Sequence, residues 1–129
     1  MKKGGILAVA YINKFYILPH ILTGANRLAL HDNLINKVID NGVIKDGEED
    51  CFWTDAYFST SIEMEEFLSC FEVEIIDHAA IDGLTPLLRK VIDNMNEEYK
   101  IWIDYQLKTC REKSILGISN HGLIVCKKI

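Results

Sequence analysis

The sequence predicts an α/β fold in which a small mixed sheet is flanked by helices. Three apolar segments, at residues 6–12, 73–82 and 117–127, have the length and composition of strands. Between them, apolar residues recur every three to four positions, which is typical of amphipathic helices. Alternation of strands and helices favours an α/β domain. Three strands are few for so many helices, so the pattern indicates part of a doubly wound sheet.

The first expected strand, ILAVAYI at residues 6–12, follows a glycine turn. An unbroken apolar run, rather than an alternating one, predicts a strand covered on both faces. A buried helix is the alternative, but the run is short and bounded by glycine. It is also far shorter than the ~18 apolar residues that span a bilayer, and no small-residue cleavage site follows it. We therefore expect neither a membrane span nor a signal peptide.

Two amphipathic helices are expected before the second strand. Residues 13–50 predict a helical insert, in which the apolar spacing from Leu34 to Ile39 indicates a helix that stops at Gly42. Thr60 and Glu63 have the spacing of a capping box, which predicts the start of the next helix. That helix is expected to bury Met64, Phe67, Leu68 and Phe71.

The second strand should start at Val73 and end near Asp82. Thr85 followed by Pro86 predicts a helix N-cap with proline at the first helical position. Helical spacing then continues to Cys110, and Asn94 with Glu97 could form a second cap that splits this region into two helices. The last strand is expected at residues 117–127.

Length, charge and cysteine content restrict the class of protein. The 129 residues suit one domain, residues 1–129. Residues 45–77 hold 11 acidic side chains and one basic, a concentration that would repel phosphate backbones, so we expect no nucleic-acid partner. The cysteines form no CxxC pair and no zinc spacing, and we expect reduced thiols, in or near the core, in a cytoplasmic protein. They are Cys51, Cys70, Cys110 and Cys126, and the equally scattered histidines, for which no metal is expected, are His20, His31, His78 and His121.

Three segments together resemble one enzyme family. Residues 2–11, KKGGILAVAY, resemble the approach to the fifth strand of class I S-adenosylmethionine-dependent methyltransferases, with Lys3 in place of the usual proline. Residues 57–68, YFSTSIEMEEFL, are similar to the family's capped helix before the sixth strand. Residues 116–128, LGISNHGLIVCKK, resemble the ending of a small-molecule branch. The resemblance implies a partial Rossmann-like fold, a three-stranded mixed sheet whose last strand is antiparallel and central.

The same resemblance implies what the chain does and what it lacks. The family binds S-adenosyl-L-methionine through a glycine-rich loop and an acidic residue in its first half, and neither motif occurs in this sequence. The chain is thus expected to be the C-terminal portion of an enzyme that methylates a small molecule, to bind no cofactor alone and to be inactive alone. Met1 could be a true start or an internal methionine. The alternative is a stand-alone dimeric binding or interaction module that retains half of the enzyme fold.

Candidate substrate-binding residues lie where strands end. Ligands of open α/β sheets bind at the carboxyl ends of the strands, so the candidates are Tyr11 and Asn13 after the first strand and Tyr57 and Phe58 before the capped helix. The 13–50 insert resembles a substrate lid. Three of the candidates have a named structural alternative: Tyr11 as core, Asn13 as a turn or cap residue, and Phe58 as a hydrophobic staple.

No residue is assigned as a general base. His78 and Asp82 are conceivable, although Asp82 before Gly83 is more simply a turn residue.

The first strand also predicts a partner. Without the family's neighbouring strand, residues 6–12 would form an apolar sheet edge, and such edges recruit another chain. We expect a homodimer in which two such edges pair across a two-fold axis.

Overall fold

The computed structural model describes residues 1–24, 30–48 and 54–129. Cys51 and parts of the acidic loop and of the predicted lid lie outside the described residues. The elements in chain order are β1 (Ile6–Asn13), the short 3-10 helix η1 (Lys14–Tyr16), α1 (Ile17–Thr23), α2 (Asp32–Asn41), β2 (Val43–Ile44), β3 (Ala56–Ser59), α3 (Ser61–Ser69), β4 (Val73–Ala80), α4 (Thr85–Ile92), α5 (Tyr99–Thr109), α6 (Lys113–Ile118) and β5 (His121–Lys128).

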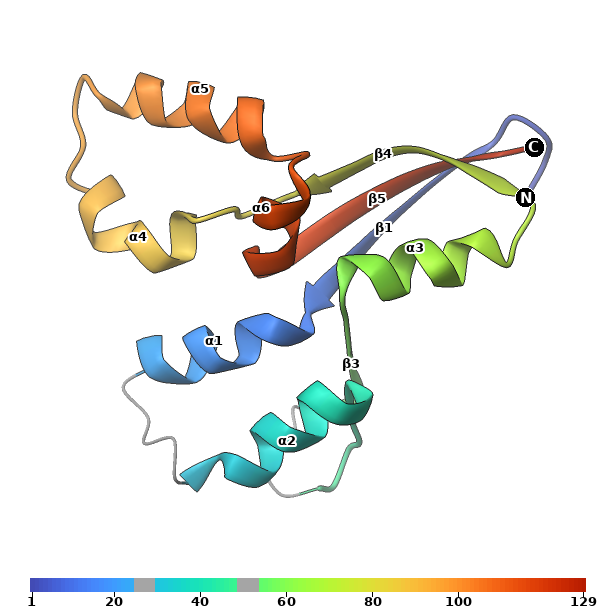
Figure 1. Cartoon of the computed structure of the whole chain (residues 1–129), viewed down its shortest axis with the longest axis horizontal. Helices are drawn as coiled ribbons and strands as arrows, with labels where there is room; N and C mark the ends of the chain where they lie inside the picture. The colour runs from blue at the N-terminus through green and yellow to red at the C-terminus, as the bar shows by residue number, and fades with distance from the viewer. Residues whose placement is uncertain (25–29, 49–53) are drawn as a thin grey trace.

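The strands form one mixed, open sheet in the order β2-β3-β1-β5-β4 (Figure 1). The last strand, β5, is antiparallel to both β1 and β4 and lies between them, as predicted. The α/β class is confirmed, but the expected number of three strands is wrong. The two missed strands, β2 and β3, have two and four residues. Segments this short carry no alternation of apolar and polar residues that would distinguish them from a loop.

The missed strand β3 covers one end of the β1 edge. It pairs with β1 in parallel at Ile12↔Phe58 and Asn13↔Ser59. Among the described residues, the stretch from Ile6 to Tyr11 has a strand partner on the β5 side alone.

The prediction that β1 is covered on both faces is wrong. Leu7 and Val9 pack toward α3, in a cluster with the buried side chains of Leu68, Ile124 and Cys126. On the opposite face Ala8 and Ala10 are exposed, and Ile6 is 59% exposed. Figure 1 shows α3 alongside one face of the β1–β5–β4 part of the sheet. One-sided cover therefore explains why this apolar strand leaves half of its side chains in solvent.

A second core lies beyond the end of β1, between the predicted insert and β3. It joins α1, α2, β2 and β3, and its buried members are Ile17, Ile21, Val38, Ile44 and Phe58. The predicted stop of α2 at Gly42 is confirmed, since this residue has φ +69, a conformation that glycine adopts without strain. The insert thus forms helices packed beside the end of β1, and its role as a lid stays a prediction.

The capping box that starts α3 is confirmed: Thr60 Oγ1 accepts from the Glu63 amide, and Glu63 reaches back to the Thr60 amide. The predicted core of this helix is wrong in part. Met64 and Leu68 face the sheet, whereas Phe67 and Phe71 are 58% and 54% exposed and contact each other instead. A helix on the surface of a sheet buries the side chains of one face only, and Phe67 and Phe71 are not on that face.

The expected core position of Cys70 is also wrong, because this residue follows the last turn of α3 and is exposed. Cys110 is half-buried and Cys126 is buried, and all three described cysteines are free thiols.

The C-terminal helices differ from the prediction at their ends. The N-cap of α4 is Leu84 rather than Thr85, and Thr85 Oγ1 instead accepts a hydrogen bond from Gln106. The predicted split is confirmed, but the N-cap of α5 is Glu98, which makes no side-chain cap hydrogen bond. Asn94 lies before this position, and its side-chain amide donates to the Lys90 carbonyl. The last strand begins later than predicted, since residues 113–118 form α6.

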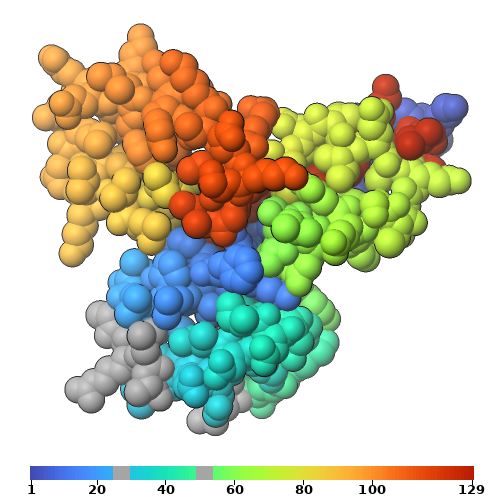
Figure 2. Space-filling view, viewed as in Figure 1, coloured from blue at the N-terminus to red at the C-terminus, as the bar shows by residue number. Residues whose placement is uncertain are grey.

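Three parts of the molecule, the α4–α5 pair, the sheet with α3, and the α1–α2 insert, meet near the end of β1. Figure 2 shows the α4–α5 pair, the α3–sheet region and the α1–α2 insert as three projections around the start of α1. No helix in the described ranges is both long and apolar enough to cross a membrane.

Candidate functional site

A row of three side chains crosses the sheet where its strands end. The register pairs Ile12 of β1 with Phe58 of β3 on one side and with His121 of β5 on the other. Because directly paired residues lie on the same face of a sheet, these three side chains stand next to one another. The carboxyl ends of β1 and β3 and the start of β5 therefore build one surface.

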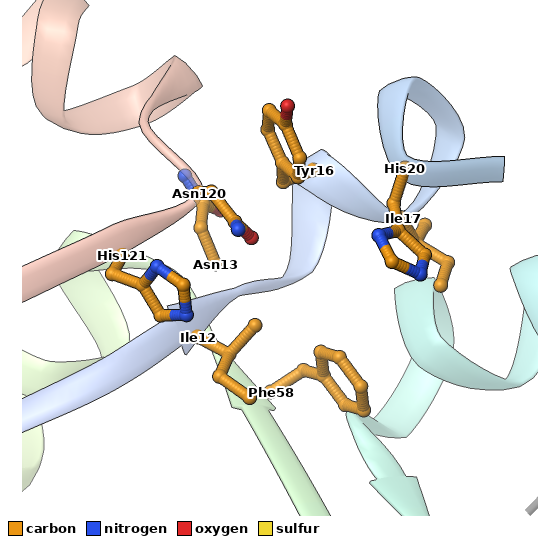
Figure 3. A pocket seen from close by; sticks show the side chains of 8 residues that line it. All are labelled: Ile12, Asn13, Tyr16, Ile17, His20, Phe58, Asn120 and His121. Atoms are coloured by element: carbon orange, nitrogen blue, oxygen red, sulfur yellow. The ribbon is translucent and has the colours of Figure 1, made fainter. Parts of the chain in front are cut away.

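A cavity of about 150 Å³ lies at this row. It is bounded by β1, β3, β5, η1 and α1, and its lining residues are Ile12, Asn13, Tyr16, Ile17, His20, Phe58, Asn120 and His121 (Figure 3). Figure 3 shows the imidazoles of His121 and His20 pointing from opposite sides toward the space above Ile12 and Phe58. The cavity thus combines apolar walls with polar groups at its rim, the usual composition of a small-molecule site.

Asn13 closes the cavity but is itself held by the structure. Its Oδ1 accepts from the Phe15 amide at 3.0 Å, and its Nδ2 donates to the carbonyls of Gly117 and Leu116 at 2.9 and 3.2 Å. The side chain is 1% exposed. Its hydrogen-bonding groups fix the turn from β1 into η1 against α6, which is the capping role that sequence analysis gave as the alternative.

The main polar feature of the cavity is His121 held by Asp82. His121 Nδ1 lies 2.6 Å from Asp82 Oδ2, and the same oxygen accepts the His121 backbone N–H at 2.9 Å. An ionised carboxylate can accept but not donate, so in the neutral form of the imidazole it is Nδ1 that carries the proton. Nε2 then keeps a lone pair and can accept a hydrogen bond.

Ser119 fixes Asp82 and His121 relative to each other. This residue is fully buried. Its Oγ donates to the His121 carbonyl at 2.8 Å and accepts from the amides of Gly83 and Asp82 at 3.0 and 3.2 Å. The end of β4 and the start of β5 are therefore joined through one hydroxyl, and the imidazole is oriented before any ligand arrives.

The carboxylate of Asp82 also affects the pKa of the nearby Tyr16 side chain. Burial raises the pKa of the Tyr16 hydroxyl, and the negative charge of Asp82 shifts it in the same direction. Tyr16 therefore stays neutral at physiological pH, and the cavity wall disfavours a further negative charge.

The structure brings two of the four predicted site residues to the cavity, Asn13 and Phe58. Tyr11 lies elsewhere, on the α3 face, where its hydroxyl is 2.9 Å from His78 Nε2. Tyr57 is 60% exposed at the β2–β3 edge, with its hydroxyl 3.0 Å from Lys45 Nζ.

The conceivable base His78 is buried against α3 and bonds to Tyr11 and Glu65 rather than to the cavity. Asp82 lies in the turn after β4, as predicted, with its carbonyl accepting from the Thr85 amide, and its carboxylate also orients His121. Sequence analysis missed Tyr16, His20, Asn120 and His121 as lining residues. The Asn120-His121 pair stood in a segment already singled out, but nothing in the sequence indicated its pairing with residue 12.

Among the described residues, no open glycine turn joins a strand to a helix. A cofactor cradle needs an open glycine turn between a strand and a helix, and the single glycine so placed among them, Gly83, lies between β4 and α4. The Gln106 side chain fills the space where a Cβ at Gly83 would stand and donates to the Asp82 carbonyl. In the same part of the chain, no group of three or more His, Cys, Asp or Glu residues could hold a metal ion.

No protein-family model matches the chain, and comparison with curated proteins finds no relative.

Proposed function

We propose that this chain is the acceptor-binding portion of an S-adenosylmethionine-dependent methyltransferase whose parent transfers a methyl group to a small molecule. The support from sequence is the order of three motifs, which runs essentially end to end along the chain. The proposal includes a partial Rossmann-like relationship and a cytoplasmic location.

One structural observation carries the proposal. The last strand lies antiparallel between two mutually parallel strands, β1 and β4, as the resemblance implies. The cavity lies at the carboxyl end of β1, where open α/β sheets bind their ligands. The cofactor-binding half is then expected to come from another segment, because Gly83 provides no cradle.

Calorimetric titration of the chain with S-adenosylmethionine tests whether the cofactor-binding half is absent from these 129 residues. We expect no tight binding to the 129-residue chain. Tight binding would overturn the proposal that the cofactor half is missing.

The DNA sequence upstream of the Met1 codon tests whether the chain derives from a longer methyltransferase. An in-frame segment with a glycine-rich loop after an apolar strand would support the methyltransferase, and a ribosome-binding site without such a frame would contradict it.

A dimeric interaction module is the second candidate function, and the exposed edge of β1 favours it. Residues 6–11 have no charge, and their described strand partner lies on one side. Apolar edges without charged residues recruit further strands. We propose that two β1 edges would pair across a two-fold axis in such a module.

Size-exclusion chromatography with light scattering tests the dimer. We expect a mass of two chains that persists on dilution to micromolar concentration. Replacing Ala8 by Lys should shift the molecule to one chain, because the charge would lie next to the pairing edge, whereas a Lys at the distant exposed position Ile101 should not. A monomer at high concentration would exclude the dimer.

A further inference from the structure

The cavity has the size and wall chemistry for a single aromatic ring. Its volume is about 150 Å³, and an apolar cavity of about this volume in another protein holds a benzene molecule. Ile12, Ile17 and Phe58 supply the apolar surface, and the Phe58 ring can pack edge-to-face against an aromatic ligand.

His121 presents an unused hydrogen-bonding atom to the cavity. The described hydrogen bonds of His121 use Nδ1, the backbone amide and the carbonyl, and leave Nε2 without a protein partner. Figure 3 shows this imidazole directed into the cavity from β5. In the neutral imidazole Asp82 holds the proton on Nδ1, so Nε2 can accept a hydrogen bond from a ligand in the cavity.

The negative charge of Asp82, next to the His121 imidazole, favours a neutral ligand over an anionic one. Asp82 already places a carboxylate behind His121, so a carboxylate or phosphate ligand would meet a second negative charge, and no lysine or arginine is among the lining residues to offset it. A neutral group that donates one hydrogen bond suits the site better, and on an aromatic ring the simplest such group is a hydroxyl.

We propose that this cavity binds a single phenolic ring whose hydroxyl donates a hydrogen bond to His121 Nε2, with the ring packed among Ile12, Ile17 and Phe58. This assignment rests on the proposed function for its biological meaning, because it names phenols as the class of methyl acceptor. The binding itself needs no cofactor and no second chain. Asp82 is a positioning residue that acts through the imidazole.

The test is a titration of the full chain with phenol and with anisole, followed by protein NMR. Anisole has the same ring but no donor hydrogen, so the comparison isolates the hydrogen bond. We expect phenol to bind about fivefold more tightly than anisole, the effect of one hydrogen bond. The imidazole ¹⁵N spectrum at pH 8 should show the proton on Nδ1, and the His121 Nε2 resonance should shift with phenol.

Variants separate the hydrogen bond from the cavity. His121→Leu should weaken phenol binding about fivefold and leave anisole binding unchanged. Asp82→Asn should weaken phenol binding by disturbing the imidazole. The matched control is Asp77→Asn, the same change in a carboxylate that pairs with Arg111 at 2.7 Å outside the cavity, and it should change neither affinity.

Equal affinities for phenol and anisole, or an unshifted Nε2 resonance at saturation, would overturn the proposal. If His121→Leu fails to fold, the response of the Nε2 resonance to phenol in the unmodified chain tests the hydrogen bond by itself. Since the titration contains no cofactor, its failure contradicts the ligand class and not the methyltransferase origin. The upstream DNA and the cofactor calorimetry test that origin separately.

Discussion

Replacing Gly122 by Ala is expected to destabilise the fold by about 3 kcal/mol or more. Gly122 lies in the central strand β5, directly opposite Tyr11 in β1. A Cβ at this position would overlap the ring and hydroxyl of Tyr11. The ring cannot move away at low cost, because it is 8% exposed and its hydroxyl is bonded to His78. Overpacking of a well-filled core costs about 1 to 3 kcal/mol, and more when side chains cannot adjust.

The matched control is Gly117→Ala, the same change in α6. Nothing lies within 4 Å of a Cβ at that position, and alanine favours a helix over glycine by about 1 kcal/mol. Urea unfolding of both variants should therefore show a large loss for Gly122→Ala and no loss for Gly117→Ala. Equal midpoints for the two variants would mean that the Tyr11 ring does not fill the space above Gly122.

Local features of this fold could be predicted from the sequence because neighbouring residues determine them. The capping box of α3 needs two residues three apart, and the stop of α2 needs a glycine at a positive φ. The long strands β1, β4 and β5 were also expected. Their order came from the family resemblance rather than from periodicity.

The candidate site could not be predicted, because it depends on contacts between distant segments. Asp82 and His121 are 39 positions apart, and they meet through the pairing of β4 with β5 and through the Ser119 hydroxyl. β3 has four residues, yet its pairing with β1 brings Phe58 to the cavity. A shift of one residue in that register would turn the Phe58 ring to the opposite face. Position near a strand end therefore predicted Asn13 and Phe58 correctly, but Tyr11 and Tyr57 met the same criterion and lie elsewhere.

Raising the pH from 10 to 12 is expected to destabilise the protein by about 2 kcal/mol through Tyr11 alone. Burial, assisted by the negative charge of Glu65, raises the pKa of Tyr11 to about 12. Below pH 10, the ordinary tyrosine value, the hydroxyl is protonated in both states and the Tyr11–His78 contact contributes fully. Between pH 10 and 12 the unfolded chain loses this proton while the folded chain keeps it. Stability therefore falls by about 1 kcal/mol per pH unit over this interval.

Urea unfolding at pH 9, 10, 11 and 12 measures this loss, and Tyr11→Phe is the matched control. The variant keeps the ring over Gly122 but has no ionisable hydroxyl, so it should be less stable at pH 9 and lose less stability between pH 10 and 12. Tyr16 remains in both proteins, and since burial raises its pKa as well, some alkaline loss should persist in the variant. Identical slopes for the two proteins would show that Tyr11 ionises freely in the folded state. The Glu65–His78–Tyr11 chain would then not shield the hydroxyl from water, and the contact between α3 and the sheet would be looser than the distances of 2.8 and 2.9 Å indicate.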